Sequence, residues 1–203
     1  MFLCYSYFWY YKFTTSRDTF KRGILMSSTK LSAGDKFPDM VVKKLGGGEF
    51  KLGVPQNGAN WQMVVVYRGK HCPLCTKYLA KIHGMKEEFL SAGVDIVAVS
   101  ADTKEKATLQ AGEKLELTFD VGYDLSIDQM KELGVYISHP RSPQETDRPF
   151  AEPGLFIINE EGNLHVVDIS NNPFVRPELD ALLSGINWIR NPENNYPIRG
   201  TYK

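Results

Sequence analysis

The stretch of sequence that decides the fold runs from residue 64 to residue 75 and reads Val64-Val65-Val66-Tyr67-Arg68-Gly69-Lys70-His71-Cys72-Pro73-Leu74-Cys75. An apolar, β-branched run typical of a buried strand stops at a turn that contains a glycine. Two cysteines separated by Pro-Leu follow, and residues 76–90 then show apolar residues at helical spacing. This order predicts a strand, a turn, a Cys-x-x-Cys motif and a helix.

The position of the motif at a helix start predicts reactive sulfur. Backbone N–H groups there lack intrahelical acceptors and favour negative charge, which lowers the pKa of a nearby thiol. Cys75 shares the inward face of the helix with Leu79 and Ile82, whereas Cys72 is expected to be freer to meet solvent. We therefore expect Cys72 to be the nucleophile and Cys75 the resolving thiol, with a reversible disulfide between them.

Other interpretations of the cysteines remain open at this point. Free cysteines also pack as small inert hydrophobes. A structural zinc site needs four ligands, and Cys4 is the only other cysteine. His71 with a distant His139 or His165 would be required for a copper or zinc site. Redox chemistry is the favoured interpretation, and it requires no bound metal or cofactor.

Composition limits the function further. The 203 residues contain 24 Lys and Arg and 24 Asp and Glu, so no basic excess indicates nucleic-acid binding. Three cysteines do not make a disulfide framework, which favours a reducing, cytoplasmic location. Residues 1–25 begin with an aromatic, apolar run over 1–11 that is too short to span a bilayer. We expect them to be an N-terminal extension outside the fold, followed by one domain over 26–190 and a tail over 191–203.

The remaining elements predict an α/β fold. Pattern and turn residues indicate, in order, a hairpin over 39–52, strands over 62–67 and 94–100, a helix opened by a capping box of Asp102 and Glu105, a strand over 119–123, a helix opened by Ser126 and Gln129, a polar loop over 138–152, a hairpin over 155–168 and a last helix over 179–189. This order implies a mixed central sheet with helices on both faces. The cysteine motif then lies at the carboxyl end of a central strand, the usual place for a site in such a sheet.

Over roughly residues 31–190 the chain resembles the AhpC/TSA peroxiredoxin-like family of the thioredoxin superfamily. The resemblance rests on 67–69, on Cys72-Pro73-Leu74-Cys75-Thr76, on the run 94–102, on 153–159 and on Gly162-Asn163. It implies a thioredoxin-like fold of peroxiredoxin type and an antioxidant oxidoreductase acting through a redox-active disulfide.

The family signature is altered in this chain. Laid on the peroxiredoxin pattern Pro-x-x-x-Thr-x-x-Cys, the peroxidatic cysteine falls on Cys75, the threonine on Cys72 and the proline on Arg68. The distant arginine of the family falls on Pro153, where thioredoxins place a cis-proline. The resemblance therefore predicts a cis peptide bond between Glu152 and Pro153 that presents backbone to the cysteines, with a trans proline opening a strand as the alternative.

Three arginines are candidates to replace the lost one: Arg68, Arg148 and Arg176. A cation near the sulfur would stabilise thiolate. Arg68 is favoured because the sequence alone puts it within a few residues of both cysteines.

These observations predict a thiol-dependent peroxidase or disulfide reductase. A peroxide or a disulfide would accept the electrons, and a thioredoxin or glutathione-type reductant would restore the Cys72–Cys75 pair. A protein-disulfide reductase without peroxidase activity and a metal carrier using Cys72, Cys75 and a histidine are the alternatives. We expect no nucleic-acid or membrane partner, with a homodimer as a candidate assembly.

Overall fold

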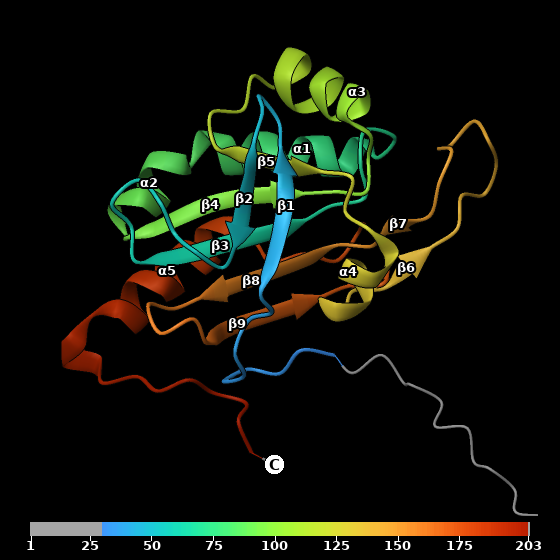
Figure 1. The fold of residues 1–203 in the computed structure, drawn as a ribbon. Helices are drawn as coiled ribbons and strands as arrows, with labels where there is room; N and C mark the ends of the chain where they lie inside the picture. The colour runs from blue at the N-terminus through green and yellow to red at the C-terminus, as the bar shows by residue number, and fades with distance from the viewer. Residues whose placement is uncertain (1–29, 203) are drawn as a thin grey trace, which may run out of the picture.

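A single mixed sheet of seven strands, in the order β2-β1-β5-β4-β3-β8-β9, forms the centre of the molecule (Figure 1). The computed structural model describes residues 30–202, so the expected extension over 1–25 lies outside the described residues. The strands of this sheet are β1 Met40–Lys44, β2 Glu49–Leu52, β3 Trp61–Val66, β4 Val94–Val99, β5 Asp120–Tyr123, β8 Gly154–Ile158 and β9 Leu164–Ile169. β3, β4 and β5 run parallel, and β8, β9 and the β1–β2 hairpin add antiparallel pairs.

Helices pack on both faces of the sheet, as the sequence predicted. The helical elements are α1 Pro73–Gly84, α2 Lys86–Ser91, α3 Lys104–Ala107, a π-helix η1 Thr108–Lys114, α4 Ile127–Glu132, α5 Leu179–Arg190 and a short η2 Pro192–Asn194. Among the residues that the structure describes, none of these helices combines the length and the apolar character needed to cross a membrane.

Alternation along β3 divides the core into two clusters. Met63 and Val65 face α1, α2 and α5, whereas Val64 and Val66 face α4 and the β1–β2 hairpin. This follows from the two-residue period of a strand, which points successive side chains to opposite faces. Because both faces of β3 are covered, its six residues are all buried.

Three local predictions are wrong in detail. The helix expected over 76–90 begins at Pro73 and is interrupted at Met85. The expected Asp102–Glu105 capping box is absent, because Thr103 is the N-cap of α3 and accepts a hydrogen bond from the Lys106 N–H. The polar loop expected over 138–152 carries at its two ends the short antiparallel strands β6 Ile137–Ser138 and β7 Phe150–Ala151.

Candidate functional site

The turn between β3 and α1 is fixed by a close contact between Gly69 and Asp102. The carboxylate of Asp102 accepts a hydrogen bond from the Lys70 N–H at 2.6 Å. Gly69 has a φ of +121°, and a β-carbon at this position would lie 2.6 Å from the Asp102 Oδ1 atom. Only glycine combines this backbone conformation with this approach. Asp102, three residues after the end of β4, thus fixes the turn that leads into the cysteine motif.

Cys72 is the N-cap residue of α1. Its sulfur accepts a hydrogen bond from the Cys75 N–H at 3.2 Å, in the position that a serine or aspartate oxygen usually takes at a helix start. Pro73 follows as the first helical residue, where its missing N–H costs nothing. The two cysteines, both free thiols, therefore lie side by side at the first turn.

Both thiols are buried, which corrects the expectation that Cys72 meets solvent. Cys72 is 2% exposed and Cys75 is 0% exposed. The reason is that Cys72 packs into the same apolar cluster as Cys75, Tyr67 and Leu79. The two sulfurs differ in their hydrogen bonds, and hardly at all in exposure.

The pKa values of the two thiols move in opposite directions. Hydrogen bonding from the Cys75 thiol, and then from the Cys75 N–H, lowers the pKa of Cys72 to about 6, against the effect of burial. The charges of Arg68 and Arg176 lower it further. Burial, followed by the hydrogen bond that it donates to Cys72, raises the pKa of Cys75. Of the two thiols, Cys72 is therefore the one that loses its proton more readily.

Arg176 is the cation in contact with a sulfur. Its Nη2 atom lies 2.9 Å from the Cys75 sulfur. The guanidinium stacks 5.0 Å from the ring centre of Tyr78, one turn along α1, and the Tyr78 hydroxyl donates to the Pro177 carbonyl at 2.9 Å. The segment before α5 is therefore anchored on α1, and this places Arg176 beside the Cys75 thiol.

Arg68, the favoured candidate, is occupied elsewhere. It lies 3.4 Å from carboxylate oxygens of both Glu145 and Glu152 and stacks on the ring of Phe150. Arg68 lowers the pKa of Cys72 through its positive charge, whereas the arginine in direct contact with a sulfur is Arg176, at Cys75. Arg148 pairs with Asp124 and Asp147 at the surface.

Pro153 immediately precedes β8, and its peptide bond with Glu152 is trans. No cis peptide bond occurs among residues 30–202, so the prediction of a cis-proline is wrong. The Glu152 N–H donates to the Tyr136 carbonyl at 2.8 Å and the Pro153 carbonyl accepts from the Ser170 N–H at 3.0 Å. These flanking bonds keep the chain extended from β7 into β8. Pro153 still lines a small cavity together with Tyr78 and Arg176, next to the motif.

A buried glutamine, which no motif in the sequence indicated, supports the cysteine motif. Gln110, on the π-helix η1, donates from Nε2 to the Thr76 hydroxyl at 2.9 Å. That hydroxyl in turn donates to the Cys72 carbonyl at 3.3 Å. π-helical turns are often found at functional sites. Here the wider turn accompanies a side chain that ties η1 to the first turn of α1.

The histidines are not gathered around the cysteines. His71 packs on Phe150 with ring centres 4.5 Å apart, and His165 packs on Trp61 at the opposite end of β3. Within residues 30–202 no group of three His, Cys, Asp or Glu side chains is placed to hold a metal ion.

Comparison with known proteins agrees with this architecture. The model of the AhpC/TSA family matches residues 33–167. The chain belongs to the AhpC/TSA family. A curated protein of Synechocystis sp., provisionally named a peroxiredoxin, is 28% identical to this AhpC/TSA protein over 141 residues, which are 64% of this chain and 68% of the relative.

Solved structures of low sequence identity share the fold. Peroxiredoxin 6 of Arenicola marina superposes with a TM-score of 0.67 at 17% identity, over 80% of this chain and 75% of its own. AhpC of Mycobacterium bovis gives a TM-score of 0.66 at 15% identity, over 86% and 99% of the two chains. A peroxiredoxin-like protein from Aquifex aeolicus gives 0.64 at 21% identity, over 78% and 87%. This AhpC/TSA protein therefore has the thioredoxin-like fold of peroxiredoxins.

Proposed function

We propose that this AhpC/TSA protein is a thiol–disulfide oxidoreductase in which Cys72 attacks a peroxide or a disulfide and Cys75 resolves the product. The observation that carries the proposal is the asymmetry of the pair. Cys72 has a pKa lowered to about 6, because it accepts hydrogen bonds from both the thiol and the N–H of Cys75. At neutral pH the attacking thiolate is therefore present before any acceptor arrives.

With a peroxide, the Cys72 thiolate attacks one oxygen, the O–O bond breaks, and the departing oxygen takes up a proton to leave as water or alcohol. Cys72 becomes a sulfenic acid. The Cys75 sulfur then attacks the Cys72 sulfur, the S–O bond breaks, and water leaves with the Cys75 proton. The products are the Cys72–Cys75 disulfide and the reduced peroxide.

With a disulfide, the Cys72 thiolate attacks one sulfur, the S–S bond breaks, and the first thiolate leaves. Cys75 then attacks the Cys72 sulfur of the mixed disulfide, and the second thiolate leaves as Cys75 loses its proton. In both routes the attack by Cys75 requires its deprotonation. The Arg176 guanidinium, 2.9 Å from the Cys75 sulfur, stabilises the charge that develops there.

Disulfide reduction without peroxidase activity is the second candidate. It is favoured by the altered signature, in which Arg68, Cys72 and Pro153 replace the proline, threonine and arginine of the family pattern. In either case we expect an outside thioredoxin or glutathione-type donor in a reducing compartment to return the pair to its thiol form.

The test is single-turnover oxidation of the reduced protein, with hydrogen peroxide in one arm and a small disulfide in the other. We expect the Cys75→Ser variant to accumulate a sulfenic acid or mixed disulfide on Cys72 and the Cys72→Ser variant to react far more slowly. Thiol labelling across a glutathione redox series should give a midpoint in the range of redox-active pairs, roughly −270 to −120 mV. Wild-type reactivity in Cys72→Ser together with an inert Cys75→Ser variant would reverse the two roles. If the reduced protein reacts with the disulfide but consumes no peroxide, the second candidate, disulfide reduction without peroxidase activity, is the function.

A further inference from the structure

The side chain of Gln110 reaches the cysteine motif from the π-helix η1. It is 1% exposed, and its Nε2 atom lies 2.9 Å from the Thr76 hydroxyl oxygen and 3.4 Å from the Gly69 carbonyl oxygen. An amide nitrogen carries two N–H donors. Gln110 therefore directs both of its donors to the segments that flank Cys72, one before it and one after it.

The two groups that Gln110 binds are also groups that hold the backbone of Cys72. The Gly69 carbonyl accepts a hydrogen bond from the Cys72 N–H at 3.1 Å, and the Thr76 hydroxyl donates to the Cys72 carbonyl at 3.3 Å. Hydrogen bonds in such a chain polarise and strengthen one another. One amide thus braces the partner of the Cys72 N–H and a partner of the Cys72 carbonyl at the same time.

The oxygen of the same amide has no partner. The Oε1 atom of Gln110 is buried and accepts no hydrogen bond from residues 30–202. An unpartnered buried acceptor lowers stability and therefore needs a reason. Gln62, fully buried on β3, uses both ends of its amide: its Oε1 atom accepts the Gly53 N–H at 2.6 Å, and its Nε2 atom donates to the Val54 carbonyl at 2.9 Å. The amide of Gln110 is instead turned toward the cysteine motif at the expense of its own oxygen.

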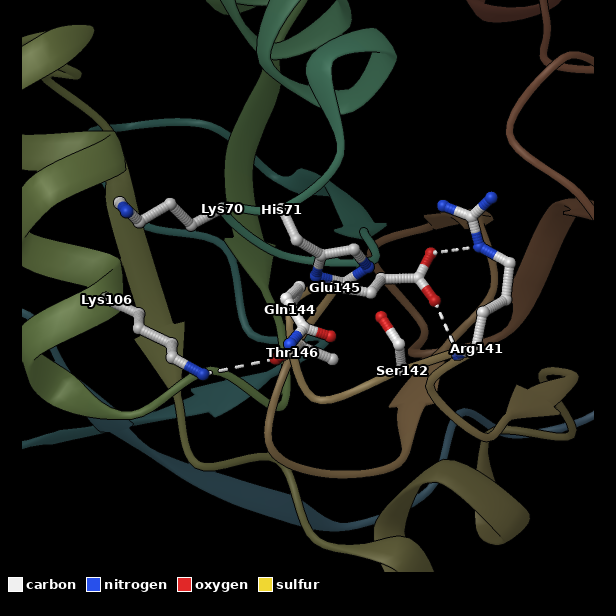
Figure 2. A pocket seen from close by; sticks show the side chains of 8 residues that line it. All are labelled: Lys70, His71, Lys106, Arg141, Ser142, Gln144, Glu145 and Thr146. Carbon is white, nitrogen blue, oxygen red and sulfur yellow. Dashed lines mark hydrogen bonds and ion pairs between the residues drawn. The ribbon is translucent and has the colours of Figure 1, made fainter.

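The helix that carries Gln110 is also fixed on another side. Lys106, four residues earlier, donates to the Thr146 hydroxyl at 3.1 Å and pairs with the Asp147 carboxylate at 2.7 Å. Figure 2 shows Lys106 reaching from its helix to Thr146, beside a cavity of about 470 Å³. α3 and η1 are therefore held between the loop before β7 and the cysteine motif.

We infer that Gln110 is a positioning residue for Cys72, whose amide keeps the Cys72 sulfur within hydrogen-bond distance of the Cys75 N–H at the start of α1. Its own hydrogen bonds go to Gly69 and Thr76, so it acts on the sulfur through the backbone of Cys72. The inference rests on the proposed function, in which Cys72 attacks, and adds a residue outside α1 that holds the attacking group in place.

Loss of the Gln110 amide should raise the pKa of the Cys72 thiol. When Cys72 is held less firmly, the 3.2 Å hydrogen bond from the Cys75 N–H to the Cys72 sulfur forms for less of the time. Complete loss of one hydrogen bond to a charged group would shift the pKa by about 1–2 units, so partial loss should shift it by roughly half a unit to one unit. At about pH 5, below the wild-type pKa of about 6, this shift leaves roughly 3- to 9-fold less thiolate.

The test is a pH titration of ultraviolet thiolate absorbance in the reduced full-length protein, which needs no electron acceptor. Gln110→Met removes the amide and keeps most of the side-chain length, and it should raise the midpoint by roughly half a unit to one unit. Gln62→Met is the matched control, because it also removes a buried amide with several hydrogen bonds from the core. Both variants should lower the free energy of unfolding in urea, but Gln62→Met should leave the midpoint unchanged.

Thr76→Val provides a second variant on the same hydrogen-bond chain. It removes the hydroxyl that joins the Gln110 amide to the Cys72 carbonyl and keeps the shape of the side chain. We expect it to raise the midpoint in the same direction. The double variant Gln110→Met/Thr76→Val should show less than the sum of the two single shifts, because both substitutions break one chain. Thr76→Val also decides the question if Gln110→Met does not fold.

The outcomes separate the positioning role from the chemistry. A midpoint that is unchanged in Gln110→Met, or in Thr76→Val where Gln110→Met does not fold, would overturn the role of Gln110 and leave the proposed function standing. An equal rise in Gln62→Met would do the same, since it would show a general effect of a weakened core. Absence of any reaction with peroxide or disulfide in the single-turnover experiment would overturn the proposed function, whereas the titration curves would still decide the role of Gln110.

Discussion

Replacing Arg176 by methionine should slow the second step of disulfide exchange and largely spare the first. The guanidinium contacts the Cys75 sulfur at 2.9 Å, whereas it acts on Cys72 only through its charge. Methionine keeps much of the length and the apolar body that packs on Tyr78, so the change removes charge and hydrogen bonding with little loss of volume.

The magnitude follows from one charge-assisted hydrogen bond. Such bonds contribute about 1.5–3 kcal/mol. Losing this hydrogen bond raises the pKa of Cys75, so less of the thiolate forms, but each thiolate is a stronger nucleophile. With a Brønsted coefficient of about 0.4–0.5, the gain in nucleophilicity offsets nearly half of the lost free energy. The remaining barrier of roughly 0.8–1.6 kcal/mol corresponds to a resolution step about 4- to 15-fold slower.

An aromatic disulfide that releases a coloured thiol separates the two steps. The first release reports attack by Cys72, and the second reports resolution by Cys75. Arg176→Lys keeps the charge and should recover part of the second rate. Arg148→Met removes an arginine that, within residues 30–202, forms ion pairs only with Asp124 and Asp147, and it should change neither phase. A slower first phase with an unchanged second phase in Arg176→Met would refute the reasoning and make Cys75 the attacking residue.

Two further predictions concern pH and the turn before the motif. The ultraviolet thiolate absorbance of the reduced protein should titrate with a midpoint at about pH 6 and be lost in Cys72→Ser, because the pKa of Cys72 is lowered from 9.0 to about 6. Because the pKa of Cys72 is lower in the folded state than in the unfolded state, the free energy of unfolding of the wild type relative to Cys72→Ser should be greatest above about pH 9 and fall as the pH decreases through 6. A difference between the two proteins that does not change with pH would contradict a Cys72 thiolate. Gly69→Ala should lower the free energy of unfolding by about 1–3 kcal/mol more than Gly47→Ala, measured in urea. Both glycines have positive φ, +121° for Gly69 and +114° for Gly47, but a β-carbon added at Gly69 would meet Asp102, whereas one added at Gly47 has no heavy atom of residues 30–202 within 4 Å. Equal losses of stability in the two variants would remove the role assigned to the Gly69–Asp102 contact.

Local patterns in the sequence determined most of the architecture. The apolar runs that became β3 and β4, and the glycine-rich hairpin of β1 and β2, follow from two-residue alternation and turn chemistry. The Ser126–Gln129 capping box is present as predicted, since both of its hydrogen bonds join residues three positions apart. The Cys-x-x-Cys pair at the start of α1 is likewise local. Such features depend on neighbours within one element, so the sequence displays them directly.

The surroundings of the cysteines were decided by the tertiary structure. Arg176 lies 101 residues beyond Cys75, and its contact depends on how the segment before α5 crosses α1. Asp102 fits a helix cap by spacing, yet the parallel pairing of β3 and β4 turns its carboxylate to the Lys70 N–H. The trans bond before Pro153 reflects hydrogen bonds to Tyr136 and Ser170 on other segments. Periodicity in the sequence reports which face a residue occupies, whereas the partner that it meets there depends on the path of the whole chain.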